Sequence, residues 1–496
     1  MADDKQDNPE KKDSPQGAVN INASTPQRHN HPLLPGVTDA SPPRFVSWDE
    51  IQAAAAGQAT KMFLAHEVAV DQEFRLDRAA PAAGSVEQRV RETMHNAFWD
   101  LLREKLAADP PNYDQALVLL DDIKQNLCDC LLAHHSRLKV EIEEVLDKEH
   151  IRQQVLNNSL DFKFYADFVV NMISKLCAPI RDDNVRQLRE ETDVVNLFRK
   201  ILELLDLMKL DIANFTISVF KTDITMKSIQ LEKTEFKKYL TVQTENGVDG
   251  LENTKKWLLK HHTEPTPSSN WYKILGKSYI DLLDWPADCT NYPETVMMDR
   301  TRFTNIGAEL HKLAIVASVV LVAADSSQGA LQVIPDAKLK IKALALEAVK
   351  DTALSDIESC LTPLAEKVVV ETTEAMKKTS VEPLNGDRQS ILYHTILQVK
   401  DPSQRIRQLV YNRMREFIQS VIAMDATRSK QIPGGLSWMH SELMALSARI
   451  VLLVKHNRDV FWEFYCQIFA EQDAVLSGHQ SEGKEAAQDD GKVEQG

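Results

Sequence analysis

Residues 192–220 of the chain read TDVVNLFRKILELLDLMKLDIANFTISVF. Apolar residues recur in this stretch at steps of three and four, a spacing that places them on one face of an α-helix. Additional leucines widen this face around most of the helix, so we expect a core helix that other helices cover on several sides. The expected inward face consists of Val194, Phe198, Ile201, Leu202, Leu205, Met208, Ile212, Phe215 and Val219.

Polar residues mark the start of this helix and argue against a membrane span. Asp193 can cap the first turn, because its carboxylate accepts hydrogen bonds from the free backbone amides there. Arg199 and Glu203 stand one turn apart and can pair. Each charge is costly near the centre of a bilayer, which favours a buried helix of a soluble protein. The charges are Lys200, Glu203, Asp206, Lys209 and Asp211, besides Arg199.

The composition is that of an ordinary globular protein. The chain has 496 residues, of which 43% are apolar and 26% charged, and this length predicts two or more packed units. The net charge of −15 favours solubility and gives no electrostatic reason to bind nucleic acid. The N-terminus lacks a secretory signal and the six cysteines are scattered, so we expect a cytoplasmic protein with reduced thiols. The most apolar run, residues 313–324, is too short to cross a bilayer.

The fold class predicted from the whole chain is all-α, either a multi-helix bundle or an irregular helical solenoid with disordered termini. No segment alternates between apolar and polar residues as a half-buried strand does, and no repeat of fixed period is present. Asp299 and Ser437 are expected to cap the helices that follow them. Prolines at positions 335, 363, 383 and 402 are expected to separate helices, and residues 433–435 to form a turn.

Composition shifts divide the chain into five segments. Residues 1–42 are polar and proline-rich and are expected to be a disordered tail. A helical block over residues 43–240 is followed by a loop or linker at 241–272, where the helical period fades around glycines and prolines. A second helical block covers residues 273–470. The acid-rich residues 471–496 are expected to be a disordered tail.

No motif predicts a catalytic, cofactor or metal site. The sequence Gly276-Lys277-Ser278 ends like a phosphate-binding loop, but Trp271 occupies the position of the required earlier glycine. Glu92 and His95 have the spacing of half a di-iron motif, whose second half is missing. Cys128 and Cys130 lie near two histidines at a spacing that fits no common zinc pattern. We therefore expect a protein that is not an enzyme and that binds other proteins.

Two charged segments are candidates for partner binding. At a proline-stopped corner, Arg181, Asp182 and Arg186 form either a charged notch for docking or a helix–helix corner held by arginine–carboxylate pairs. Further along, an expected helix carries four arginines beside an apolar face, and these form either a solvated face or a site for phosphate or an acidic segment. They are Arg405, Arg407, Arg413 and Arg415.

Five ordered blocks of sequence resemble the T-complex protein 11 family. They are residues 95–100 (HNAFWD), 176–182 (LCAPIRD), 208–215 (MKLDIANF), 293–299 (PETVMMD) and 433–436 (PGGL). The resemblance covers roughly residues 41–469. Two further segments, 41–46 and 65–67, resemble the T-complex protein 11-like subgroup. One departure is Lys221-Thr222-Asp223, where family members tend to carry Arg-Pro-His, so no role is transferred to that corner.

The resemblance implies an all-helical protein without catalytic residues that takes part in signal transduction. It implies a scaffold or regulator linked to cyclic AMP and protein kinase A, with protein partners that belong to signalling pathways. The alternative that it leaves open is a cytoskeleton-associated protein that binds actin or microtubules. In that case the arginines between positions 405 and 415 would face the acidic filament.

Overall fold

The computed structural model describes residues 58–77, 84–132, 134–157, 159–286, 289–423 and 432–489. Within these ranges every regular element is a helix and none is a strand, which confirms the all-α prediction. The tail predicted over residues 1–42 lies outside the described residues, as do residues 43–57 of the first predicted block.

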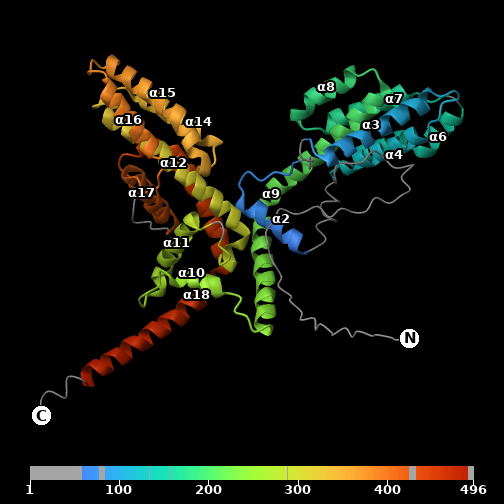
Figure 1. The fold of residues 1–496 in the computed structure, drawn as a ribbon. Helices are drawn as coiled ribbons and strands as arrows, with labels where there is room; N and C mark the ends of the chain where they lie inside the picture. Colours follow the sequence, from blue (N-terminus) through green and yellow to red (C-terminus); the bar gives the residue numbers. More distant parts are fainter. Residues whose placement is uncertain are drawn as a thin grey trace, which may run out of the picture. The chain divides into compact units, whose positions relative to one another are not determined.

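The first part of the chain forms helices α2 to α9 (Figure 1). Ser85 caps α3 as its position suggested, because its side chain accepts a hydrogen bond from the amide of Gln88. The bounds are α2 (Gln58–Val70), α3 (Val86–Ala107), α4 (Asp114–Asp129), α5 (Ser136–Val145), α6 (Lys148–Leu156), α7 (Phe162–Leu176), the 3-10 helix η1 (Pro179–Arg181), α8 (Asp182–Glu190) and α9 (Val194–Glu245).

The second part contains helices α10 to α18 and several short 3-10 helices. Gly307 lets α12 approach η3 closely, since a Cβ at this position would collide with the backbone of Leu283. The bounds are α10 (Glu252–Leu259), η2 (Ser268–Asn270), α11 (Trp271–Asp281), η3 (Leu282–Asp284), η4 (Glu294–Asp299), α12 (Arg300–Ser326), α13 (Ala330–Val333), α14 (Pro335–Lys350), η5 (Leu354–Asp356), α15 (Ile357–Lys378), α16 (Gly386–Gln398), α17 (Arg405–Ile422), η6 (Ser437–Met439) and α18 (His440–Asp489).

Helix α9 is the stretch from which the sequence analysis began, extended to 52 residues. Asp193 caps it, its carboxylate accepting a hydrogen bond from the amide of Val195 at 3.0 Å. Arg199 and Glu203 form the expected pair at 3.2 Å. The first turns are buried as predicted, with Phe198 and Leu205 at 1% and 0% exposure.

The predicted inward face of α9 is wrong in its last part. Phe215 and Val219 were expected inside, but their exposed fractions are 66% and 57%, and the neighbouring Phe220 is also exposed. The physical reason is that an apolar pattern spread around most of a helix does not show which side is covered. Ala213 and Ile217 stay buried at 8% and 5% exposure, while Phe215 and Val219 lie on the opposite side of the same turns.

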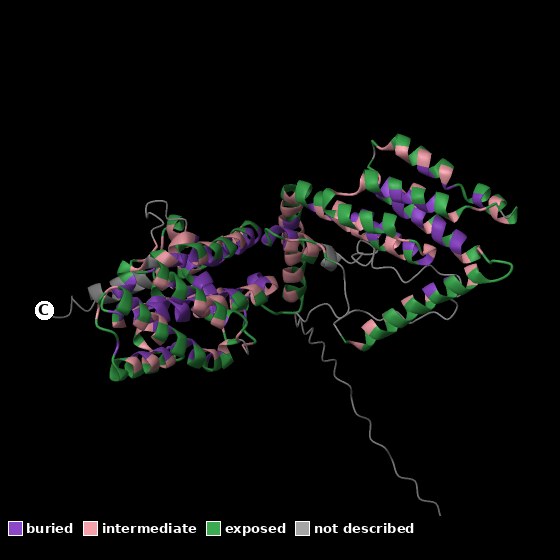
Figure 2. Ribbon diagram, turned by 90° about the horizontal axis from the view of Figure 1, so that it is seen from above, coloured by how far each residue is buried: buried purple, intermediate pink, exposed green. Residues whose placement is uncertain are grey.

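Two apolar cores are present, and α9 contributes to both (Figure 2). The first core combines buried residues of α3 to α9, with Ile123, Val169 and Ile201 fully covered. The second core is built around α12 and includes residues of α10, α11 and α14 to α18. Near its other end α9 packs Phe236 against this second core. The helix is therefore shared between the two cores.

Residues 241–272 were expected to be a loop or linker around a short helix at residues 254–260, and the structure has a helix there, α10, which contributes to the second core. Trp257 on α10 is 2% exposed, and its indole nitrogen donates a hydrogen bond to the carbonyl of Ser278 at 2.7 Å. The helical period fades here because α10 is short and lies between turns. A short helix buries an isolated aromatic residue without showing a long apolar face.

Prolines and caps act as predicted at most positions. Pro335 starts α14, while Pro383 and Pro402 lie between helices. Pro363 was expected to separate helices but lies inside α15, where it leaves one carbonyl of the preceding turn without its helical amide. Ser437 was expected to cap the last helix, yet η6 intervenes and α18 begins at His440.

Helix α18 continues to Asp489, through most of the range 471–496 that was expected to be a tail. This extension is rich in alanine, glutamine and glutamate, which are good helix formers even without apolar packing. Residues 490–496 lie outside the described residues.

One helical stretch, Glu294–Ser326, is long and apolar enough to cross a membrane by length and composition. It contains α12, and 72% of its most apolar window is buried inside the protein. Burial of this kind is what the core helix of a soluble protein shows.

Two substitutions on α9 test where the helix is covered. Leu205→Ala removes a fully buried side chain from the first core and is expected to lower the free energy of unfolding by about 2–5 kcal/mol. Phe215→Ala removes an exposed ring and is expected to change the free energy of unfolding by less than about 0.5 kcal/mol. Urea denaturation followed by circular dichroism measures both, and equal losses would mean that Phe215 is covered in solution.

Candidate functional site

The predicted corner at Arg181 is a structural contact between two helical segments. The guanidinium donates two hydrogen bonds to the carboxylate of Asp211 on α9, at 2.8 Å from Nε and 2.7 Å from Nη2. Asp182 is exposed in the first turn of α8, and the exposed Arg186 pairs with Asp183 on the same helix. Arg181 is therefore occupied inside the protein, which leaves Asp182 and Arg186 at the surface.

The four predicted arginines of α17 do not form one open basic face. Arg407 is buried and donates to the carbonyls of Val399 and Lys400 at 3.1 and 2.5 Å, so it fastens the end of α16. Arg415 lies 3.4 Å from Asp284. Arg405 and Arg413 are the exposed pair, and Arg413 makes one long contact to a carbonyl of the turn before η6.

A buried polar cluster, which the sequence did not reveal, joins α2, α9, η4 and α18. We call it the His66 cluster and define it as His66, Glu232, Asp299 and His456, whose side chains are 2–4% exposed. His66 Nδ1 lies 3.1 Å from Glu232 Oε1, and His66 Nε2 lies 3.0 Å from Asp299 Oδ1. His456 Nε2 lies 2.8 Å from the same Oε1 of Glu232. The two imidazole rings meet edge to face at 5.0 Å.

Further polar groups surround the His66 cluster. The hydroxyl of Ser228, one turn before Glu232, donates to Glu232 Oε1 at 2.7 Å. Arg302 lies 3.0 Å from Asp299 and also pairs with Glu67, which is adjacent to His66 in α2. Asp299 was expected to cap α12, but its side chain makes no capping bond and turns toward His66 and Arg302. Nδ1 of His456 has no hydrogen-bond partner among the described atoms.

The electrostatics of the His66 cluster follow from burial and close partners. Burial alone would lower the pKa of His66, but the hydrogen bonds to Asp299 and Glu232 outweigh burial and raise the pKa to about 10. Burial alone would raise the pKa of Glu232, but the hydrogen bonds from His456 and His66 outweigh it and lower the pKa to about 2. The carboxylate of Glu232 is therefore held in its charged form.

Sequence reasoning missed the His66 cluster because its members are far apart in the chain. His66 and Glu232 are 166 residues apart, and Glu232 and His456 are 224 apart. A local signal does exist, since each residue sits at an inward position of an apolar helical face. Buried charges need partners, so these positions could have been grouped as one polar cluster, though not assigned to specific pairs.

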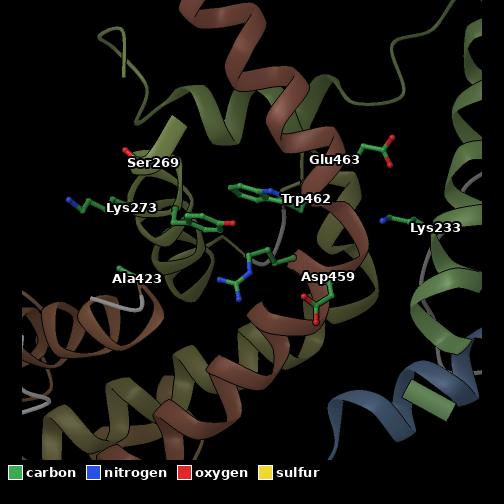
Figure 3. A pocket seen from close by; sticks show the side chains of 9 residues that line it. Lys233, Ser269, Lys273, Ala423, Asp459, Trp462 and Glu463 are labelled. Carbon is green, nitrogen blue, oxygen red and sulfur yellow. The ribbon is translucent and has the colours of Figure 1, made fainter. Parts of the chain in front are cut away.

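An open groove of about 750 Å³ lies beside the His66 cluster (Figure 3). Lys233 of α9 and Lys273 of α11 lie on opposite sides of Trp462 of α18. Trp462 stacks on Tyr272, with ring centroids 4.2 Å apart and planes at 4°, and Arg458 lies over the ring of Tyr272 at 5.4 Å. The remaining lining residues are Ser269, Ala423, Asp459 and Glu463.

The groove and the His66 cluster share two helices. Glu232 belongs to the cluster while its neighbour Lys233 lines the groove, and His456 belongs to the cluster while Arg458 and Trp462 line the groove. The contact between Glu232 and His456 therefore joins α9 and α18 directly behind the groove. The cluster is closed to solvent and suited to holding helices or an ion, whereas the groove is open to a ligand.

The segment that departs from the resemblance also has a structural role. Lys221 of α9 donates to the carbonyls of Asp71 and Gln72 at 2.6 and 3.1 Å, just after the end of α2. A lysine at this place satisfies carbonyls that have no helical partner. Asn214 bonds both backbone groups of Leu76, so the chain that follows α2 is also fixed to α9.

Comparison with known proteins gives one consistent family. The family model described as T-complex protein 11 matches residues 64–470. The human T-complex protein 11-like X-linked protein 1 is 31% identical over 440 residues, 83% of this chain and 87% of that protein. The human T-complex protein 11 homolog is 31% identical over 433 residues, which cover 82% of this chain and 85% of that protein. No solved structure matches.

The substitution Glu232→Gln tests the His66 cluster. It removes the charge that holds His66 and His456 and is expected to cost roughly 3–5 kcal/mol of unfolding free energy, as for one partner of a buried ion pair. Glu203→Gln on the same helix breaks the exposed pair with Arg199 and is expected to cost less than about 1 kcal/mol. Urea denaturation of both variants measures the difference, and a small loss for Glu232→Gln would contradict the role given to this carboxylate.

Proposed function

The chain belongs to the T-complex protein 11 family, and from this premise we propose that it is a cytoplasmic adaptor or regulator in signal transduction. It acts by binding a protein partner and not by catalysis. The observation that carries the proposal is the open groove between Lys233, Lys273 and the stacked pair Tyr272 and Trp462. A link to cyclic AMP and protein kinase A is the finer form of the proposal.

The chemistry of the groove favours an acidic peptide segment that carries apolar side chains. The net charge of the chain is −15, whereas the groove is lined by three cations (Lys233, Lys273 and Arg458) and two carboxylates (Asp459 and Glu463), which leaves one net positive charge in the lining. Charge of this kind steers an oppositely charged partner and fixes its orientation. The stacked Tyr272 and Trp462 offer a rigid apolar surface, and tyrosine, tryptophan and arginine are enriched where binding energy concentrates.

The lining of the groove does not favour catalysis. The described residues that line the groove include one serine, Ser269, and neither a histidine nor a cysteine. Nucleophilic catalysis needs a base within hydrogen-bond reach of the nucleophile. The histidines of the neighbouring His66 cluster are buried and turned toward Glu232 and Asp299, so they do not supply that base.

Reversing the charge of the groove tests this proposal. Proximity labelling in cells is performed with the full chain, with Lys233→Glu/Lys273→Glu, and with Lys377→Glu/Lys378→Glu as a control of equal charge change on the exposed end of α15. Signalling kinases, phosphatases or their regulatory subunits are expected with the unchanged chain and the control. The groove variant is expected to lose them, because each loss of about 1.4 kcal/mol weakens binding tenfold.

The purified partner then gives a direct measurement. Its dissociation constant is expected to rise with salt and to rise at least about tenfold in the groove variant, as charge complementarity requires. Enrichment of no signalling component would contradict the adaptor role. Equal binding by the groove variant and the control would remove the groove as its site.

A second candidate function is association with actin or microtubules. The observation that favours it is that Arg405 and Arg413 remain exposed on α17, about two turns apart, although Arg407 and Arg415 are bound internally. Co-sedimentation with purified filaments tests it. Pelleting at low salt is expected to disappear in Arg405→Glu/Arg413→Glu, and absence of pelleting of the unchanged chain at low salt would exclude this function.

A further inference from the structure

The strongest unassigned feature is the convergence of three potential metal ligands in the His66 cluster. Nδ1 of His66, Nε2 of His456 and a carboxylate oxygen of Glu232 all lie within 4.8 Å of one another. They come from α2, α18 and α9, so the tertiary fold alone brings them together. We propose that His66, Glu232 and His456 bind one divalent transition-metal ion, with zinc as the ion that suits these ligands best.

The distances fit such an ion after small side-chain movements. Ligands at about 2.1 Å from a tetrahedral zinc ion lie about 3.3–3.5 Å from one another. His66 Nδ1 and His456 Nε2 are now 3.1 and 2.8 Å from Glu232 Oε1. Each nitrogen therefore needs to move away from Glu232 by only a few tenths of an ångström, while the ligand atoms of the two histidines, which lie within 4.8 Å of each other, turn toward a common ion. Two imidazoles and one carboxylate are a ligand set that zinc accepts, and a fourth position remains for a water molecule or the nearby hydroxyl of Ser228.

The groups around these ligands support the same conclusion. A histidine that binds a metal with one ring nitrogen almost always donates its other N–H to a carboxylate or carbonyl. Nε2 of His66 lies 3.0 Å from Asp299, on the side of the ring away from Glu232. Arg302 in turn holds Asp299 at 3.0 Å. Asp299 would therefore orient His66 toward the ion.

The net charge of the groups in and around the cluster also favours a divalent cation. A metal ion that binds Nδ1 of His66 displaces the proton that this nitrogen carries in the metal-free protein, and the proton leaves to solvent. The groups joined by these contacts then carry the negative charges of Glu67, Glu232 and Asp299. Arg302 supplies one positive charge, so two negative charges remain, and Glu232 and Asp299 are almost completely buried. Buried charge must be compensated, and one divalent ion compensates it in full.

The bound ion would have a defined structural effect. It would tie α2, α9 and α18 together at one point, directly behind the groove lined by Lys233 and Trp462. This inference does not depend on the proposed function, because its test measures metal and not partner binding.

The test is the metal content of the purified full chain. The protein is loaded with zinc chloride, desalted and analysed by mass spectrometry for zinc and the neighbouring transition metals. Roughly one zinc ion per chain is expected in the unchanged protein, and almost none in His456→Gln. Zinc is also expected to raise the melting temperature of the unchanged chain but not of His456→Gln, because a ligand of the folded state stabilises it.

Two further variants keep the result interpretable. Asp299→Asn leaves all three ligands in place and is expected to weaken zinc affinity about tenfold to a hundredfold, so it replaces His456→Gln if that variant does not fold. His134→Gln/His135→Gln removes two neighbouring histidines near α5 and is expected to retain the zinc. The proposal fails if the unchanged chain holds no zinc, or if zinc is lost in the His134/His135 variant and retained in His456→Gln.

Discussion

The arrangement of helices around α9 depends on one buried carboxylate oxygen. Oε1 of Glu232 is the common partner of His66, His456 and Ser228. Apolar packing favours burial but specifies the relative position of two helices only loosely, whereas hydrogen bonds to a buried charge tolerate little displacement. The contacts with His66 and His456 therefore set the register of α2 and α18 against α9, while Ser228 holds the carboxylate from within α9. Asp299 extends the same constraint to the start of α12 through His66.

This constraint also shapes the surface that we propose for binding. The groove and the His66 cluster lie on either side of the same turns of α9 and α18. A change in the distance between Glu232 and His456 would move Lys233 relative to Trp462, since Lys233 follows Glu232 on α9 and Trp462 lies about 1.7 turns after His456 on α18. The interior polar contacts and the width of the groove are thus parts of one structural unit.

How much could be predicted from the sequence differs between local and distant features. The helical class, the cap at Asp193 and the buried Phe198 and Leu205 follow from spacing within one helix. The error at Phe215 arose because the apolar pattern surrounds most of α9 and does not show which side is covered, here the side of Ala213 and Ile217. The His66 cluster and the groove join residues of different helices, and a single sequence gives no signal for such pairing.

Two pairs of the segments that carry the family resemblance are in contact in the structure. Arg181 in the block at 176–182 bonds Asp211 in the block at 208–215. His66, in the segment at 65–67, bonds Asp299 in the block at 293–299. These segments therefore meet in space and form the charged contacts that hold helices together. The arginines of α17 were a weaker indication of a partner-binding site. A run of charged residues does not show which of its side chains are buried, as that of Arg407 is.

The order of the helices along the chain does not match their division between the two cores. Ala69 and Val70 of α2 belong to the second core, α3 to α8 build the first, and α9 returns to the second. A cut through the sequence between residues 240 and 273 would therefore not separate two independent folding units. It would leave Ala69 and Val70 of α2 without the second core, and the second core without the residues of α2 and α9 that pack against it, so that limited proteolysis or deletion by halves would yield aggregating pieces.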